Sequence, residues 1–169
     1  MSGHGRFYEA YGYHQYEISN YAKKGKECRH NLGYWTRKEY LGFGVGSASL
    51  FQNQRFTNLR DLSVYGEFNG NPESIRRDRE TLTVEDQMEE TMILGLRLLC
   101  GVSRNEFRKN FGRSVEEVYG PVLEKIQQDG IVEKRRRQDR SDKRPESVSA
   151  IRSWQIFCWM NKEAENKNG

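Results

Sequence analysis

The sequence has few cysteines, no long apolar run and only a modest share of hydrophobic residues. Its three cysteines, Cys28, Cys100 and Cys158, lie far apart, so they form neither a disulfide framework nor a Cys-x-x-Cys pair of the kind that binds metals or carries redox chemistry. No apolar stretch approaches the roughly 18 residues of a membrane span, and the opening residues lack the apolar segment of a secretory signal. These absences predict a chain without a membrane span that resides in a reducing cytoplasm.

Basic residues are concentrated in one short run. Residues 134–144 include seven basic and two acidic side chains, whereas the whole chain of 169 residues carries a net charge of only +4. The rest of the chain is therefore slightly acidic, and the sequence pI of about 9.0 reflects the run rather than the body of the protein. Because 31% of all residues are charged, above the usual quarter, we expect an irregular basic tail outside the core.

Local patterns in the first third of the chain predict short elements. We expect a helix that ends at Gly12, a short strand over residues 16–20 and a turn over 22–27. Asn31 is placed to cap a helical turn. A strand is expected over residues 40–51.

From residue 83 the apolar spacing becomes helical. The expected helix buries one stripe of side chains: Val84, Met88, Met92, Leu96 and Leu99. Ser103 and Ser114 each begin a Ser-x-x-Glu capping box, which predicts two further helices. We expect Pro121 to break the second of these, and a new helix to end at Gly130 before a hairpin strand. Helices followed by a small strand and a basic loop have the outline of a winged-helix module.

Four segments occur in the order that one family shows. They are YEISNYA at 16–22, CRHNLGYW at 28–35, YLGFGVGSAS at 40–49 and EETMILGLRLLCGVS at 89–103, with RFTN at 55–58 between the last two. In these motifs the chain resembles the C-terminal portion of the oxygen-independent coproporphyrinogen III oxidase-like family of radical S-adenosylmethionine proteins. Within that family, HNLGYW favours the branch known as heme chaperones over the oxidase itself.

The resemblance implies an α+β fold made of the terminal strands of a partial (β/α) barrel, a small helical, winged-helix-like C-terminal domain and the basic tail. We expect residues 1–60 to be the truncated end of the barrel, 61–82 a linker, 83–133 the C-terminal domain and 134–169 a divergent tail. In the family a second hairpin strand follows the C-terminal helices. We expect it to be missing here, because the departure from the family begins near Lys134.

The family's radical chemistry depends on a 4Fe–4S cluster. The cluster is held by a Cys-x-x-x-Cys-x-x-Cys loop, and its open iron site binds S-adenosylmethionine. This sequence contains no such loop. The resemblance therefore implies that the cluster and S-adenosylmethionine belong to the full-length family only, and that this chain is not an active enzyme alone.

In the heme-chaperone branch the His-Asn-x-x-Tyr-Trp motif is associated with heme binding. Here it falls on His30, Asn31, Tyr34 and Trp35. A neutral imidazole can ligate heme iron, and an aromatic ring nearby can pack on the porphyrin face. The resemblance thus implies heme or another tetrapyrrole as the ligand, His30 as its metal ligand and a heme-recipient protein as a partner. The structural alternative is that the polar pair satisfies backbone groups and the two aromatic residues fill the core.

Gly42, Gly44 and Gly46 form a second group of candidate cofactor-binding residues. A strand face without side chains lets a planar ligand approach closely. The same glycines would also permit tight packing of strands. Both interpretations remain open from the sequence.

Two other ligands, zinc and nucleic acid, are alternatives to heme. Cys28 and His30 could share a zinc ion with His14 or His4, but the paired ligands of structural zinc sites are absent. The basic run could grip phosphates as the wing of a winged helix, but the segment SVEEVYGPVLEK is acidic where a recognition helix is basic. We therefore expect neither zinc nor nucleic acid.

Overall fold

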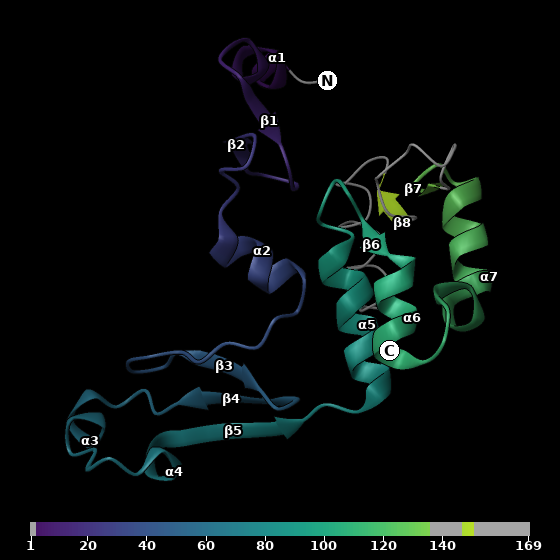
Figure 1. Ribbon diagram of the computed structural model, residues 1–169. Coiled ribbons are helices and arrows are strands. Elements are labelled where there is room, and N and C mark those ends of the chain that lie inside the picture. Colours follow the sequence, from purple (N-terminus) through teal and green to yellow (C-terminus); the bar gives the residue numbers. More distant parts are fainter. Residues whose placement is uncertain (1–2, 136–146, 151–169) are drawn as a thin grey trace. The chain divides into compact units, whose positions relative to one another are not determined.

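The structure is a computed structural model that describes residues 3–135 and 147–150 (Figure 1). It divides into two compact units, one of residues 37–89 and one of the residues before and after them. Both contain helices and antiparallel strands, which confirms the α+β class. Most of the expected basic tail, and Cys158 within it, lies outside the described residues.

The larger unit contains both ends of the described chain. Its elements are α1 (Gly3–Ala10), β1 (Tyr13–Gln15), β2 (Tyr21–Lys23), α2 (Arg29–Trp35), α5 (Val84–Gly95, which begins in the other unit), β6 (Val102–Ser103), α6 (Arg104–Phe111), α7 (Val115–Gln128), β7 (Val132–Arg135) and β8 (Ser147–Ala150). None of the helices in the described part of the chain has the length and apolarity that crossing a membrane requires.

A β-hairpin follows the first helix. As expected, α1 ends before Gly12, whose φ of 76° is left-handed and suits a glycine. The expected strand over residues 16–20 is wrong, because β1 and β2 pair antiparallel and this segment connects them. The connection folds back locally, since the carboxylate of Glu17 accepts hydrogen bonds from the backbone amide and the hydroxyl of Ser19.

Short-range capping sets the starts of the C-terminal helices. Thr83 and Asp86 bond reciprocally at the start of α5, and the Ser103 hydroxyl accepts from the third residue of α6. Ser114 forms a complete capping box with Glu117 at the start of α7. These starts agree with the sequence. Of the expected apolar stripe, Met88, Met92 and Leu96 are buried, whereas Val84 and Leu99 are exposed, contrary to expectation.

The expected helix break at Pro121 is wrong. α7 runs without interruption from Val115 to Gln128 with the proline inside it. Val115, Leu123 and Ile126, on both sides of the proline, are buried. Packing of this apolar face outweighs the backbone hydrogen bond that proline cannot make. The helix does end as expected, because Gly130, with a φ of 67°, follows its last turn.

A small sheet packs with these helices. Its strand order is β6-β8-β7, and every neighbouring pair is antiparallel. The expectation that the second hairpin strand is missing is therefore wrong, since β8 takes that place between the other two strands. Val132 and Val148 are fully buried and join Phe107 and Leu123, each 1% exposed, in the core.

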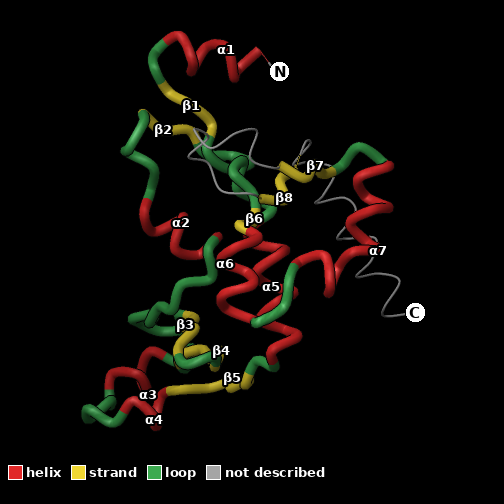
Figure 2. The backbone as a smooth tube through the Cα atoms, turned by 45° about the vertical axis from the view of Figure 1, so that its right-hand side comes forward, coloured by secondary structure: helices red, strands yellow, loops and turns green. Residues whose placement is uncertain are grey.

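The smaller unit is a three-stranded antiparallel sheet with two short helices. Its elements are β3 (Ala48–Phe51), β4 (Gln54–Asn58), α3 (Leu62–Gly66), α4 (Pro72–Ile75) and β5 (Arg76–Thr81). The strands lie in sequence order, side by side (Figure 2). Gln52 and Asn53 make the tight turn between β3 and β4 with left-handed φ angles of 50° and 56°. The described strands of both units form no closed barrel.

The expected strand over residues 40–51 is right only at its end. Residues 41–47 are a loop, and β3 begins at Ala48. Gly44 and Gly46 adopt left-handed φ angles of 96° and 65°, which a regular strand does not contain. The buried side chain of Asn58 holds the loop, because its amide donates to the carbonyl groups of Gly42 and Gly44.

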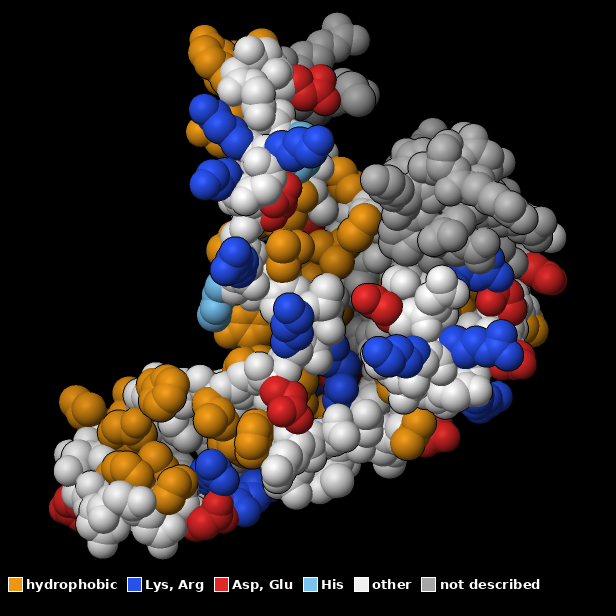
Figure 3. Space-filling model, in the orientation of Figure 1, with side chains coloured by type: hydrophobic (Ala, Val, Ile, Leu, Met, Phe, Trp, Pro, Cys, Tyr) orange, Lys and Arg blue, Asp and Glu red, His pale blue; other side chains and the backbone are white. Residues whose placement is uncertain are grey.

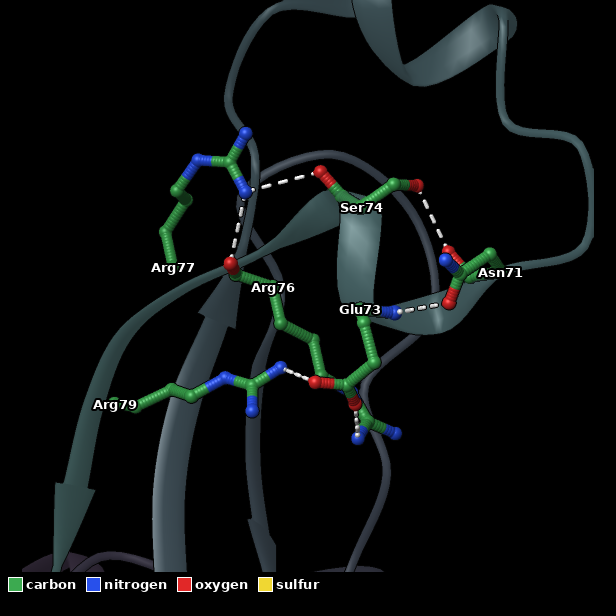
Figure 4. Close-up of polar contacts among 6 residues, drawn as sticks. All are labelled: Asn71, Glu73, Ser74, Arg76, Arg77 and Arg79. Carbon is green, nitrogen blue, oxygen red and sulfur yellow. Dashed lines mark hydrogen bonds and ion pairs between the residues drawn. The ribbon is translucent and has the colours of Figure 1, made fainter.

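An ion-pair network joins α4 to β5 (Figure 4). Asn71 caps α4 by accepting a hydrogen bond from the amide of Glu73. The carboxylate of Glu73 pairs with Arg76 at 2.8 Å and with Arg79, while Arg77 turns away to backbone carbonyl groups. These ion pairs lower the pKa of Glu73, chiefly through the bond from Arg79.

Candidate functional site

All four residues of the His-Asn-x-x-Tyr-Trp motif lie on α2. The helix is seven residues long, and its N-cap is Cys28, which makes no side-chain capping bond. Asn31 therefore lies inside the helix and does not begin it, contrary to expectation. None of the seven side chains is buried, so α2 lacks the apolar face that usually holds a short helix in place.

His30 is exposed at the surface of this helix. Its ring lies edge to face with that of Tyr34, one turn along α2, at a centroid distance of 4.7 Å and an interplanar angle of 85°. Among the described residues, neither ring nitrogen of His30 has a hydrogen-bond partner. Nor does the carboxamide of Asn31 bond within the described chain, so the alternative in which the pair satisfies backbone groups finds no support.

Trp35 faces a different partner. The guanidinium of Arg97 lies over its indole, 4.2 Å from the ring centroid. The indole Nε1 is buried and has no hydrogen-bond partner within the described chain. Of the two aromatic residues expected at the porphyrin face, Tyr34 is therefore the one beside His30, while Trp35 is engaged by Arg97.

Arg97 also reaches a fully buried carboxylate. Its Nη2 lies 3.6 Å from Oε2 of Glu17, whose side chain is 0% exposed. The backbone joins the same two segments, because the amide of Ile18 donates to the carbonyl of Arg97 and the amide of Leu99 donates to that of Tyr16. Three motifs far apart in the sequence, YEISN, HNLGYW and GLR, thus meet at Glu17, Trp35 and Arg97. The sequence motifs contain Glu17 and Arg97 but do not indicate that the two side chains meet, although an arginine just after an apolar helix is a usable signal.

The candidate glycines lie in the smaller unit, in the loop held by Asn58. A Cβ built on Gly42 would lie 2.3 Å from the carbonyl oxygen of Ala48, so the backbone approaches closely there and the position requires glycine. Gly44 has open space around it instead. Hydrophobic side chains gather on the surface at this end of the unit (Figure 3), and the exposed ones there are Leu41, Phe43, Val45, Leu62, Val64 and Phe68.

The described residues do not support a zinc site. No group of three potential metal ligands comes together in the described ranges. His14 is engaged elsewhere, with its Nε2 3.0 Å from Oε1 of Glu27. Backbone hydrogen bonds, from the amides of Glu27 itself and Gly25, lower the pKa of Glu27, and its bond to His14 adds to the effect. Cys28 and Cys100 are both exposed, and neither forms a disulfide within the described chain.

Heme fits the donors of α2 better than zinc does. A heme iron could be held by a single accessible donor atom of the protein, whereas zinc needs three or four converging ligands. The exposed imidazole of His30, without a hydrogen-bond partner in the described chain, meets the first requirement. When bound, heme supplies an open iron coordination position and a large planar apolar surface.

Comparison with known proteins finds one matching family and several relatives. The HemN C-terminal domain family matches residues 82–138. The heme chaperone HemW of Bacillus subtilis (strain 168) is 40% identical over 124 residues, which cover 73% of this chain and 33% of that protein. HemW of Lactococcus lactis subsp. lactis (strain IL1403) is 36% identical over 133 residues, or 78% of this chain and 35% of that protein. The chain thus spans about a third of the length of the curated relatives that it matches.

A solved structure shares the fold. The radical SAM enzyme coproporphyrinogen III oxidase (HemN) from Escherichia coli superposes with a TM-score of 0.59 at 16% identity, covering 90% of this chain and 37% of that one. Together these matches show that the chain corresponds to the C-terminal part of the HemN-like radical S-adenosylmethionine proteins. Within that class it lies on the heme chaperone branch.

Proposed function

We propose that this chain binds heme through His30, as part of a heme chaperone-like protein. The observation that carries the proposal is the accessible imidazole on α2, beside Tyr34, in a chain whose relatives are named heme chaperones. A neutral imidazole at His30 would hold the iron through the lone pair of a ring nitrogen. Tyr34 restricts the ring of His30 from one side and would offer apolar surface to the ligand.

The glycine loop has a smaller part in the proposal. Gly44 and Gly46 adopt left-handed conformations and present backbone without a side chain, which suits contact with a flat ligand. Gly42 is needed for its own close packing against Ala48, and this supports a structural role at that position. We keep all three as candidate tetrapyrrole contacts, with Gly44 the first to test.

The wider activity belongs to the longer protein. We propose that the iron–sulfur cluster and S-adenosylmethionine are held by parts that this chain does not match, and that bound heme passes to a recipient protein in the cytoplasm. We also retain the proposed division into residues 1–60, 61–82, 83–133 and 134–169. A nucleic-acid role is not proposed, because the start of α7 is acidic, with Glu116 and Glu117 in its first turn.

The test is a titration of the full chain with ferric heme, followed by absorbance in the Soret region. Wild type and His14→Ala are expected to give the same saturable shift, because His14 pairs with Glu27 and is not part of the proposed site. His30→Ala is expected to lose the shift or to weaken binding at least tenfold. An equal shift in His30→Ala and wild type would reject His30 as the ligand.

A further inference from the structure

Few interactions hold α2 in place. It has only seven residues, it lacks a side-chain N-cap, and none of its side chains is buried. A helix of this length is not stable in water by itself, so tertiary contacts must hold it. The hydroxyl of Thr36 bonds to the carbonyl of Leu32, but this bond lies within the end of the helix and fixes it to nothing else.

The stack of Trp35 on Arg97 supplies such a tertiary contact. Trp35 is the last residue of α2, and Arg97 follows the end of α5, so the stack joins the two helices within one unit. A desolvated cation–π contact with tryptophan is the strongest of its kind. The indole Nε1 of Trp35 is buried, whereas His30 is exposed.

Glu17 in turn fixes Arg97. Its carboxylate is fully buried and is itself held through Oε1 by the backbone amide and hydroxyl of Ser19, at 2.9 Å and 3.0 Å. Oε2 faces Nη2 of Arg97 at 3.6 Å. Arg97 therefore lies between the carboxylate of Glu17 on one side and the indole of Trp35 on the other, and these two contacts confine its guanidinium.

We propose that Glu17 and Arg97 are positioning residues for heme binding. They hold α2 through Trp35 and thereby set the direction in which His30 presents its imidazole. Neither residue contacts the ligand. The inference rests on the proposed function for its heme readout, but the positioning of α2 can be measured without heme.

The first experiment is hydrogen–deuterium exchange of the ligand-free chain, read by mass spectrometry on peptides that cover residues 29–35. Arg97→Ala and Glu17→Gln are expected to exchange at least tenfold faster in α2 than wild type, and Arg97→Lys to resemble Arg97→Ala because an ammonium cannot stack as a planar guanidinium does. The matched control is Arg104→Ala, which breaks a 2.7 Å ion pair to Glu116 in the same unit and is expected to leave α2 unchanged. Unchanged exchange of α2 in Arg97→Ala would overturn the proposal.

The second experiment asks whether the position of α2 matters for heme. Arg97→Ala is expected to keep the Soret maximum of the wild type, because His30 remains, but to bind heme about tenfold more weakly, or about 1.4 kcal/mol. Adding Gly33→Ala should restore part of the affinity. A Cβ at Gly33 meets nothing within 4 Å, and alanine stabilises the helix by another route. A shifted Soret maximum in Arg97→Ala, or no rescue by Gly33→Ala, would contradict the positioning role.

The two proposals fail in different ways. If wild type binds no heme but α2 loosens in Arg97→Ala, the heme function is wrong and the structural role of the stack stands. If wild type binds heme through His30 and Arg97→Ala changes neither exchange nor affinity, the positioning role alone is wrong.

Discussion

His30 and Tyr34 lie one turn apart on α2 with their rings edge to face, 4.7 Å between centroids. The contact leaves the imidazole exposed but narrows the directions in which it can point. We expect Tyr34→Ala to weaken heme binding about fivefold to tenfold, in line with about 1 kcal/mol for an aromatic pair, and Tyr34→Phe to bind as wild type does. A heme titration of the three proteins measures this, and equal affinities would remove Tyr34 from the site.

Asn58 is expected to control the order of the glycine loop. Its buried amide donates to the carbonyl groups of Gly42 and Gly44 and to the hydroxyl of Ser47. Asn58→Ala removes the donor of all three bonds, although the carbonyl of Gly44 still accepts from the hydroxyl of Ser47. We therefore expect a loss of about 2 to 3 kcal/mol in the free energy of unfolding of this unit. Urea unfolding would measure the loss, with the exposed Gln54→Ala on the same strand as control. A change in the free energy of unfolding below about 0.5 kcal/mol would show that the loop does not depend on Asn58 for its order.

Pro121 is expected to lower the free energy of unfolding of the protein. It lies in the middle of α7 and has no N–H to donate to the preceding turn. We expect Pro121→Ala to raise the free energy of unfolding by about 1 to 3 kcal/mol, because alanine restores the bond and is the best helix former. Thermal unfolding would show a higher midpoint. A lower midpoint would mean that the proline shapes the packing of α7 in a way that alanine cannot reproduce.

Two carboxylates at helix starts should make stability depend on acid pH. Hydrogen bonds from Ser114, first from its backbone, lower the pKa of Glu117, and bonds from the Thr83 side chain and backbone lower that of Asp86. A lowered folded-state pKa adds stability above the unfolded value, and this is lost as the pH falls through the folded value. Stability should therefore fall below about pH 4.5.

The double variant Glu117→Gln, Asp86→Asn removes both titrating groups. It should be less stable than wild type at pH 7, and the difference should shrink as the pH is lowered toward 3. Urea unfolding at several pH values measures this. A constant difference between the two proteins across that range would show that these carboxylates do not carry the pH dependence.

The features that the sequence predicted best are those that depend on interactions between residues close together in the chain. Thr83, Ser103 and Ser114 begin helices because each caps its own backbone, and Gly12 and Gly130 end them because each adopts a left-handed conformation. The motif order likewise predicted the family, since it depends on the sequence alone.

Features decided by distant residues were predicted poorly. Pro121 stays in a helix because Val115 and Leu123, on either side of it, pack in the core. A rule based on neighbouring residues alone does not include such tertiary packing. The glycine segment is a loop because Asn58 holds it. β8 was not recognised, because its pairing partners β6 and β7 decide its conformation and its own short pattern does not.

The candidate site likewise contains residues that a local motif predicted and residues that only the fold brings together. Its residues on α2 followed from the HNLGYW motif, but the partner of Trp35 did not. Arg97 and Glu17 come from segments far apart along the chain, and only the fold brings them together. Pattern reasoning thus finds the candidate ligand more readily than the distant residues that contact its helix.

The most direct test of the heme assignment is pulsed electron–nuclear double resonance on ferric heme bound to the full chain with 15N-labelled histidine. Coupling of the iron to a 15N imidazole nitrogen is expected in wild type and in His14→Ala, and is expected to disappear in His30→Ala. Coupling that survives in His30→Ala, or that is absent from wild type with heme bound, would contradict the account.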